Sequence, residues 1–219
     1  MASRLKSSRF KTGNLRLRVS DSLQELLIGA MIPVGRINES QLAKQLHVSR
    51  TPLREALVSL EREGFVMSGG RGFAVPPLRE REARGIYPIL GALEGLALRS
   101  SNNFETAHLK KLRTANRIFH RAAAAPRRAV AADNDFHHLL LANCVNRVLL
   151  ATIARQKLLV RRYEIIYLKQ RRFFERSVLQ HAFIIDALEK DDRDQAAKML
   201  EQNWQSALEM LLTSPDWPD

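Results

Sequence analysis

The sequence predicts a mainly α-helical protein of 219 residues, with an N-terminal winged helix-turn-helix that includes a small β-hairpin wing, and an all-helical C-terminal bundle of about six helices. Apolar residues recur at intervals of three and four through most of the chain, which is the period of an amphipathic helix. Between Gly64 and Val75 the pattern changes to period two around closely spaced glycines, as in a hairpin. The prolines of the run PPLR at residues 76–79 then break both patterns, so we place a domain boundary there.

The chain begins with a basic, serine-rich arm over residues 1–14 that lacks the apolar core of a signal peptide. Its cations could follow a nucleic-acid backbone, although such arms are more often disordered tails. No run reaches the roughly 18 apolar residues that span a bilayer, so we expect a cytoplasmic protein without membrane contact. The winged domain is predicted over residues 15–77, the helical domain over 78–213 and a short tail over 214–219.

The stretch from Glu39 to Gly64 contains two predicted helices joined by a turn. His47 in that turn can adopt the left-handed conformation at modest cost. Ser49 stands where it would cap the second helix, and Pro52 is tolerated in the opening turn, where its missing N–H costs little. Apolar residues mark the two buried faces: Leu42, Ala43 and Leu46 on the first helix, and Leu53, Ala56, Leu57 and Leu60 on the second.

The exposed start of the second helix carries Arg50, Thr51 and Arg54, which suit a DNA groove. The two arginines lie one turn apart, and an arginine fork can donate two hydrogen bonds to guanine O6 and N7. Thr51 can bond a phosphate or contact a thymine methyl group, and Ser40, near the start of the preceding helix, can meet the backbone. The alternative is that both arginines solvate the surface, with Arg54 paired to Glu55. We favour DNA because motif, spacing and context agree.

The predicted wing has its glycines at the tip, between Phe65, Val66 and Met67 on one side and Phe73, Ala74 and Val75 on the other. Glycine supplies positive φ and lets the backbone approach a phosphate or the minor groove closely. Arg71 adds positive charge there, so we expect Gly70 and Arg71 to contact DNA. The alternative is an ordinary glycine turn without DNA contact.

The composition agrees with an intracellular protein that has a polyanionic partner. The net charge is +12, and half of it lies in the first 77 residues. Hydrophobic residues make up 45% of the chain, enough for two cores. Cys144 is the single cysteine, which excludes an intramolecular disulfide and fits a reducing cytoplasm. We expect its side chain to be a small buried apolar group.

Two parts of the sequence resemble domains of a known protein family. The run VSRTPLREAL, then LEREGFV and the glycine-tipped wing, resembles the N-terminal domain of the GntR family of bacterial transcription regulators over residues 15–77, with His47 where the family often has a glycine. The spacing of helix breaks over residues 80–213 resembles the FCD domain, the ligand-sensing module of the family's FadR-type branch. Together they imply a homodimeric repressor that binds a near-palindromic double-stranded operator and responds to a small-molecule effector.

The most specific element of the second domain is the run DNDFH at residues 133–137, which looks like the FCD motif Asp-x-x-Phe-His. Asp133 and His137 are four residues apart, so both side chains share one helix face and can converge on one metal ion. His181 falls where the family has another ligand, and Asn203 where it usually has a final histidine. An amide oxygen is a weaker ligand than imidazole, and N and O ligands without sulfur favour zinc, nickel, manganese or iron.

The first helix of this domain departs from the resemblance. Leu90 stands where the family often carries an arginine, four residues before Glu94, and that arginine commonly holds an effector carboxylate. Pro88 is expected to kink or begin the helix. Cations that could substitute for the missing arginine, although most such residues are solvated or paired, are Arg161, Arg162, Arg171, Arg172 and Arg176.

Three other interpretations stay open from the sequence. The histidines could be hydrogen-bonded in a polar pocket without an ion, as lone histidines usually are. The helical domain could be a metal-dependent hydrolase fused to a DNA-binding head, although Asp135 is the sole nearby candidate for a general base and faces away from Asp133 and His137. A structural nucleoid protein would bind DNA irrespective of its sequence, with an affinity governed by salt.

Overall fold

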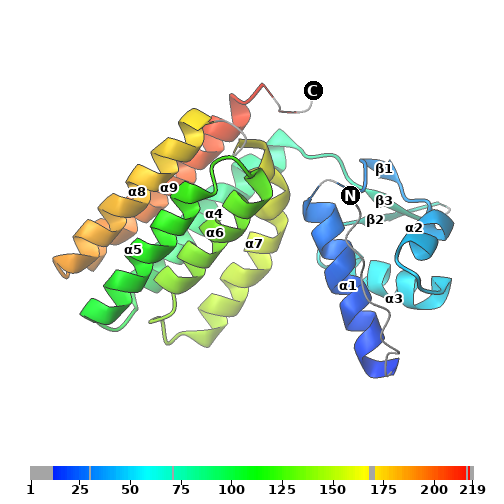
Figure 1. Ribbon diagram of the computed structural model, residues 1–219, viewed down its shortest axis with the longest axis horizontal. Helices are drawn as coiled ribbons and strands as arrows, with labels where there is room; N and C mark the ends of the chain where they lie inside the picture. Colours follow the sequence, from blue (N-terminus) through cyan, green and yellow to red (C-terminus); the bar gives the residue numbers. More distant parts are fainter. Residues whose placement is uncertain (1–11, 30, 71, 168–170, 216, 218–219) are drawn as a thin grey trace. The chain divides into compact units, whose positions relative to one another are not determined.

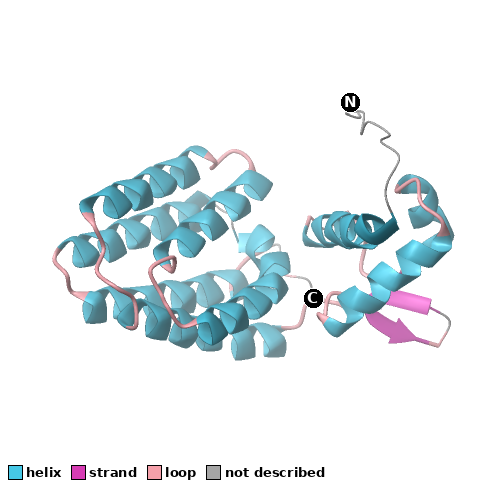
Figure 2. Cartoon of the chain, turned by 90° about the horizontal axis from the view of Figure 1, so that it is seen from below, coloured by secondary structure: helices cyan, strands magenta, loops and turns pink. Residues whose placement is uncertain are grey.

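The computed structural model describes residues 12–29, 31–70, 72–167, 171–215 and 217. The chain forms two compact units that divide between Pro77 and Leu78. Both are built mainly of helices, and the named strands of the described chain belong to the first unit (Figures 1 and 2). Within these residues, no helix combines the length and the apolar character that crossing a membrane requires.

The first unit places a long helix against the predicted helix-turn-helix. Its elements are α1 (Thr12–Ile28), β1 (Gly35–Arg36), α2 (Glu39–Gln45), α3 (Arg50–Arg62), β2 (Met67–Gly69) and β3 (Gly72–Val75). Helix α1 packs along α3. Leu23, Leu53, Leu57, Leu60 and Phe65 are fully buried and form the centre of this core.

The turn between α2 and α3 follows the sequence prediction in most respects. His47 has a φ of 54°, as expected for a left-handed turn residue. Ser49 is the N-cap of α3, but its side chain makes no capping hydrogen bond, which corrects the prediction. An N-cap hydroxyl usually bonds the second or third helical N–H, and the third position here is Pro52, which has none. Leu46, predicted to be buried, is half-buried.

The wing belongs to a three-stranded antiparallel sheet in the order β1-β3-β2. Strand β2 pairs with β3 as the predicted hairpin, while β1 was not predicted from the sequence. Gly35 is the register partner of Val75 and Arg36 of Ala74, and the N–H of Ile37 donates to the Phe73 carbonyl at 2.9 Å. Strand β1 is therefore paired with the wing immediately before the chain enters α2.

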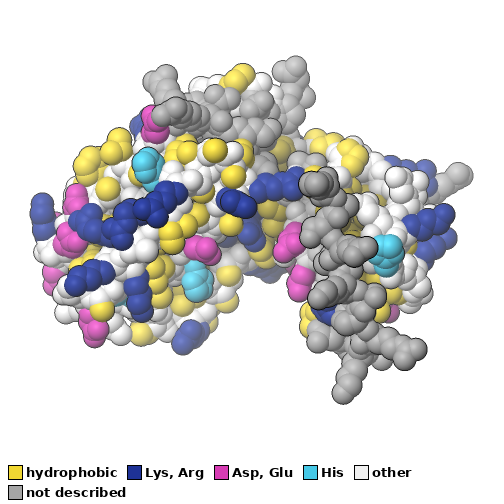
Figure 3. All heavy atoms as spheres, viewed as in Figure 1, with side chains coloured by type: hydrophobic (Ala, Val, Ile, Leu, Met, Phe, Trp, Pro, Cys, Tyr) yellow, Lys and Arg dark blue, Asp and Glu magenta, His cyan; other side chains and the backbone are white. Residues whose placement is uncertain are grey.

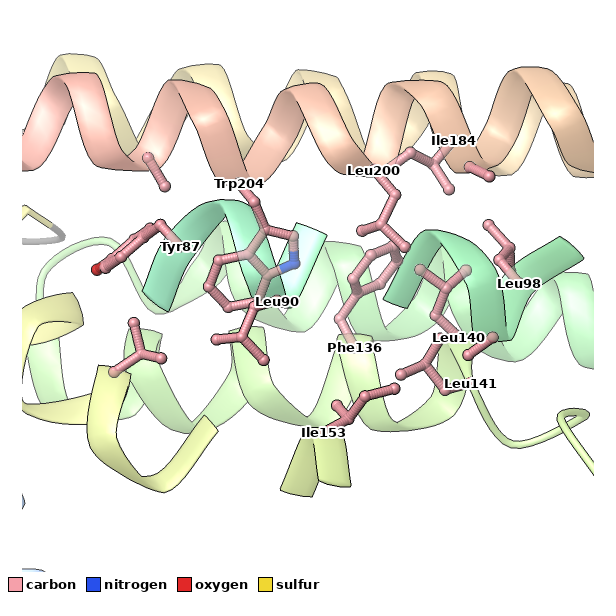
Figure 4. Packing of buried hydrophobic residues seen from close by; sticks show 14 of the residues in the cluster. Tyr87, Leu90, Leu98, Phe136, Leu140, Leu141, Ile153, Ile184, Leu200 and Trp204 are labelled. Carbon is pink, nitrogen blue, oxygen red and sulfur yellow. The ribbon is translucent and has the colours of Figure 1, made fainter. Parts of the chain in front are cut away.

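The second unit is a bundle of six helices within the described chain, as the sequence predicts. They are α4 (Glu80–Arg99), α5 (Thr106–Arg121), α6 (Pro126–Leu140), α7 (Arg147–Tyr167), α8 (Arg171–Glu189) and α9 (Arg193–Leu212). Helix α4 packs most extensively on α9, and α8 runs beside α9 (Figure 1). Trp204 and Leu200 point from α9 into the core toward Leu90 and Phe136 (Figure 4). Cys144 is buried, as expected.

Helix α4 carries two features that bear on its packing. Pro88 lies inside the helix rather than at its start, because α4 begins at Glu80. The missing N–H leaves the Arg84 carbonyl without its helical donor, but both residues are exposed and water can serve instead. Gly91 faces α9: a Cβ there would lie 3.3 Å from the Trp204 Cβ. The absence of a side chain thus lets α9 approach α4 closely.

The C-terminal end of the described chain returns to the start of the bundle. The rings of Trp217 and Tyr163 are stacked, with centroids 5.9 Å apart. The Tyr163 hydroxyl accepts from the Arg79 backbone N–H at 3.4 Å and donates to Glu82 at 3.2 Å. Helix α7 is therefore fixed to the residues that immediately follow the domain boundary.

Candidate functional sites

Helix α3 presents the predicted DNA-reading residues on its exposed face. Arg50, Thr51 and Arg54 are all exposed. They line a hollow of the surface together with Glu55, Val58, Ser59 and Arg62. Ser40 is exposed in the first turn of α2. Lys and Arg side chains also occur on the second unit (Figure 3), so positive charge is not confined to this face.

Arg54 also borders a second hollow, which is formed by the wing. Its lining consists of Arg54, Ser68, Gly69, Gly70, Gly72 and Phe73. Gly70 is exposed with a φ of 40°, as predicted for a wing tip, and Arg71 lies outside the described residues. The wing is held to α3 by Glu61, whose carboxylate accepts from the Ser68 N–H at 2.9 Å. Hydrogen bonding to Ser68 lowers the pKa of Glu61.

The ion pair of Arg54 differs from the one considered in the sequence. Its Nε lies 2.9 Å from Oε2 of Glu39, the first residue of α2, rather than pairing with the neighbouring Glu55. The Glu39 side chain is only 9% exposed, whereas that of Arg54 is 56% exposed. A nearly buried carboxylate thus touches a side chain predicted to read bases.

In the second unit, three predicted metal ligands come together. Asp133 and His137 lie one turn apart on α6, and His181 comes from α8; all three are buried. The two oxygens of Asp133 divide between the histidines: Oδ1 is 3.6 Å from His181 Nε2, and Oδ2 is 3.8 Å from His137 Nε2. One candidate ligand atom from each residue lies within 4.8 Å of the others.

Hydrogen bonds orient both imidazoles toward Asp133. His137 Nδ1 lies 2.7 Å from Glu94 Oε2, and His181 Nδ1 lies 3.2 Å from Asn116 Oδ1. Because both partners are oxygen acceptors, each Nδ1 is the donor, and in the neutral ring the lone pair is on Nε2. His181 Nε2 has no hydrogen-bond partner within the described chain. This is how protein groups usually hold histidines that bind a metal.

Other buried charges surround the trio. Glu94 Oε2 also accepts from Trp204 Nε1 at 2.7 Å, and Lys157 Nζ lies 3.4 Å from Glu94 Oε1 and 5.1 Å from the Trp204 ring centroid. Glu164 accepts from Asn134 at 3.0 Å. The site is therefore a polar centre inside an apolar bundle, in which one ammonium group faces several carboxyl groups.

Burial and neighbouring charges set the protonation of this centre. Burial acts to raise the pKa of Glu94, but His137, Lys157 and the hydrogen bonds lower it to about 2. Burial raises the pKa of Asp133, against the opposing effect of His137 and Lys157, and raises that of Glu164 to about 7. Burial also lowers the pKa of His181, which keeps the ring neutral.

Asn203 is the remaining residue that the sequence predicts as a ligand. It is buried on α9, and its Nδ2 donates to Gln180 Oε1 at 2.9 Å. This hydrogen bond uses the amide nitrogen of Asn203 and leaves its oxygen, the atom that would bind a metal ion. The predicted role of Asn203 as a ligand therefore stays a prediction.

Sequence reasoning missed the cation of this site. The substitutes considered for the arginine missing at Leu90 were arginines, and one of these, Arg176, donates instead to Ser206 at 3.2 Å. The structure places Lys157 beside Glu94. The available signal was a lysine followed by the apolar run Leu158, Leu159 and Val160. Leu90 itself is buried in the core.

Comparison with known proteins identifies both units. The family described as bacterial regulatory proteins, gntR family, matches residues 15–75, and the FCD domain matches residues 85–206. The chain is 39% identical over 84 residues to the uncharacterized HTH-type transcriptional regulator YdhC of Bacillus subtilis, a match that spans 37% of this chain and only 38% of YdhC. It is 27% identical over 207 residues to the gluconate operon transcriptional repressor of Bacillus licheniformis, spanning 90% of this chain and 84% of the repressor.

A solved structure supports the fold. The E. coli McbR/YncC structure superposes with a TM-score of 0.77, covering 90% of this chain and 97% of that one at 20% sequence identity. At that identity the likeness concerns the arrangement of elements alone.

Proposed function

Because the chain belongs to the GntR family of bacterial regulators and carries the FCD domain, we propose that it is a cytoplasmic transcription regulator whose affinity for a DNA operator responds to a small molecule. The observation that carries this proposal is the exposed start of α3, where Arg50, Thr51 and Arg54 share one hollow and Arg54 also borders the glycine-tipped wing. Repression is the proposed mode, because the gluconate operon relative is named as a repressor.

In the proposed complex, α3 enters the major groove. Arg50 and Arg54 donate to guanine edges, and Thr51 meets a phosphate or a thymine methyl group. Ser40 bonds a phosphate near the start of α2. Gly70 brings the wing backbone close to the duplex, with Arg71 as an added cation.

We also propose that two copies assemble through α4. One face of this helix carries exposed residues without charge: Gly85, Pro88, Ile89, Ala92 and Leu96. Ile89 and Leu96 are 52% and 49% exposed, which is unusual for large apolar side chains that lie one above the other on a helix. Burying this stripe against its symmetry copy would pair the two heads for a near-palindromic operator.

The buried trio is proposed to hold a divalent metal ion, with zinc, nickel, manganese and iron as candidates. Two observations support the fit: His181 Nε2 has no partner among the described residues, and the groups whose positive charge acts on the carboxyl groups of Glu94, Asp133 and Glu164 are Lys157 and His137. A divalent cation would balance that charge and favour ionised Asp133. Asn203 is retained as a further proposed ligand. When bound, the ion supplies a coordination site for an anionic effector.

The effector acts on DNA binding only if it binds two arrangements of the protein unequally. The Tyr163 contacts with Arg79 and Glu82 provide a physical route, since α7 carries both Lys157 at the buried centre and Tyr163 at the domain boundary. No observation favours the hydrolase alternative. Asp135, its candidate base, is exposed while the trio is buried.

The test is selection of preferred sequences from duplexes with a randomised central segment, followed by competition with unrelated DNA. We expect enrichment of a sequence with two related half-sites and resistance to the competitor. Equal binding of all sequences, with a strong salt dependence alone, would instead indicate a nucleoid protein. Native mass spectrometry with elemental analysis of the same sample is expected to show a dimer with one metal ion per chain; a metal-free dimer would remove the metal from the proposal.

A further inference from the structure

A carboxylate is an unexpected group on a surface that meets DNA, because phosphates repel it. Glu39 lies at that surface, with a side chain only 9% exposed and Oε2 at 2.9 Å from Arg54 Nε. The N-terminus of a helix favours an acidic residue in its first turn. That preference accounts for the charge of Glu39 but not for its contact with Arg54, which is on another helix.

The sheet register explains how Glu39 reaches Arg54. Strand β1 pairs antiparallel with β3, and the Ile37 N–H continues the pairing to the Phe73 carbonyl. Two residues later, Glu39 therefore lies beside Gly72. A Cβ on Gly72 would be 2.9 Å from Glu39 Oε1, and its φ of 140° is rarely adopted by other residues. The wing thus leaves room for the carboxylate.

The contact is an ion pair without hydrogen-bond geometry, and it still restrains the guanidinium of Arg54. Its Nε faces Glu39, whereas the side chain as a whole is 56% exposed and borders both the hollow along α3 and the hollow of the wing. A guanidinium drawn toward a carboxylate on its Nε side has fewer orientations, and its two terminal nitrogens are the pair that can reach a guanine edge.

We propose that Glu39 is a positioning residue for DNA recognition: it fixes the guanidinium of Arg54 for one base pair of the operator, in a space that Gly72 leaves open. This inference rests on the proposed sequence-specific DNA binding. It predicts that Glu39 contributes to discrimination between sequences and opposes general affinity for DNA.

The experiment uses the full-length protein and the duplex selected by it from the randomised pool. Each base pair of that duplex is substituted in turn, and the ratio of dissociation constants defines discrimination at that pair. Arg54→Ala identifies the pair that Arg54 reads. Glu39→Gln removes the charge that holds Arg54. The matched control is Glu55→Gln, which removes the same charge from an exposed residue lining the same hollow as Arg54.

We expect Glu39→Gln to reduce discrimination at the Arg54 pair roughly tenfold, within the range of a bidentate base contact. Discrimination at the other pairs should match that of Glu55→Gln, and both variants should bind unrelated DNA more tightly. In the Arg54→Ala background, Glu39→Gln should cause no further loss at that pair. If Glu39→Gln unfolds at the temperature of the assay, Glu39→Asp takes its place. It keeps the negative charge but moves the carboxylate away from Arg54, because the side chain is one methylene shorter, and it should reduce the same discrimination.

The inference is overturned if Glu39→Gln, or Glu39→Asp in its place, behaves like Glu55→Gln at the Arg54 pair. It is also overturned if the loss persists in the Arg54→Ala background, because Glu39 would then act by another route, or if Arg54→Ala changes no pair. In each of these cases the wild-type protein still selects a sequence. Failure of the wild-type protein to enrich any sequence is the distinct result that rejects the proposed function itself.

Discussion

The Nδ1 atom of His137 on α6 lies 2.7 Å from Oε2 of Glu94 on α4, and both side chains are buried. Since Glu94 is an ionised acceptor, it holds the imidazole with Nε2 toward Asp133. Groups that orient a metal-binding histidine in this way are worth about 10–100-fold in metal affinity. Glu94→Gln should therefore weaken zinc binding by about that factor. Zinc titration checks this, with the exposed Glu209→Gln on α9 as control; equal affinities would mean that Glu94 has only a packing role.

The neighbouring histidines on α6 give a matched pair of variants for testing the proposed metal site. His137 is buried in the trio, whereas His138 is exposed. His137→Ala should lose bound metal and should not gain thermal stability on adding zinc, while His138→Ala should respond like the wild type. An ion at about a hundred times its dissociation constant stabilises the folded state by about 2.7 kcal/mol. Elemental analysis and melting with and without a chelator measure both effects, and unchanged metal content in His137→Ala would exclude this site.

Arg50 offers a test of α3 as the proposed DNA-reading helix that is independent of Glu39. Loss of a base contact should weaken specific DNA binding by roughly 1–3 kcal/mol. Arg50→Ala is expected to show this loss with an unchanged melting curve, because the side chain is exposed. Arg84→Ala, on the exposed side of α4, removes an equal charge from the other unit. Equal operator affinity for the two variants would show that Arg50 is merely solvated.

The two glycines of α4 that face α9 should respond differently to alanine. At Gly91 the added Cβ meets the Trp204 Cβ at 3.3 Å and the Glu201 backbone at 3.4 Å, and neither can move without shifting α9. Overpacking of this kind typically costs about 1–3 kcal/mol, against a gain of about 1 from helix propensity. At Gly95 the obstacle is the Glu201 side chain, which can rotate away without a shift of the α9 backbone and loses only a half-exposed ion pair with Arg99. Urea unfolding should therefore rank Gly91→Ala below Gly95→Ala, and the reverse order would contradict the packing argument.

Glu164 gives the metal-free protein a definite pH dependence. Burial raises its folded pKa from 4.5 to about 7, so the folded state binds the proton more tightly than the unfolded state. The corresponding stability is fully present below pH 4.5 and is lost as the pH rises through about 7. Melting temperatures of chelator-treated Glu164→Gln should be flatter across this window than those of the wild type. The exposed Glu105→Gln should retain the wild-type slope; a parallel slope for Glu164→Gln would show that this carboxyl group does not titrate as described.

Periodicity and turn chemistry were sufficient for the helices of the bundle and for the hairpin, because long amphipathic segments and glycine turns are local features. Strand β1 has only two residues and shows no period of its own. Local patterns also could not predict the contact partners of the candidate functional residues. The contacts of Arg54 with Glu39 and of Glu94 with Lys157 join separate helices. Asp133 and His137 could be paired from their spacing, whereas His181 came only from a family resemblance.

The pairing of β1 with β3 has a consequence for engineering new operator preferences. It sets the start of α2 against the wing, and thereby joins Glu39, Arg54 and Gly72 from three separate stretches of sequence. A transplant of α3 alone into a related winged domain would carry Arg54 but would leave out Glu39 and Gly72. The smallest transferable part is therefore the continuous segment from Gly35 to Val75.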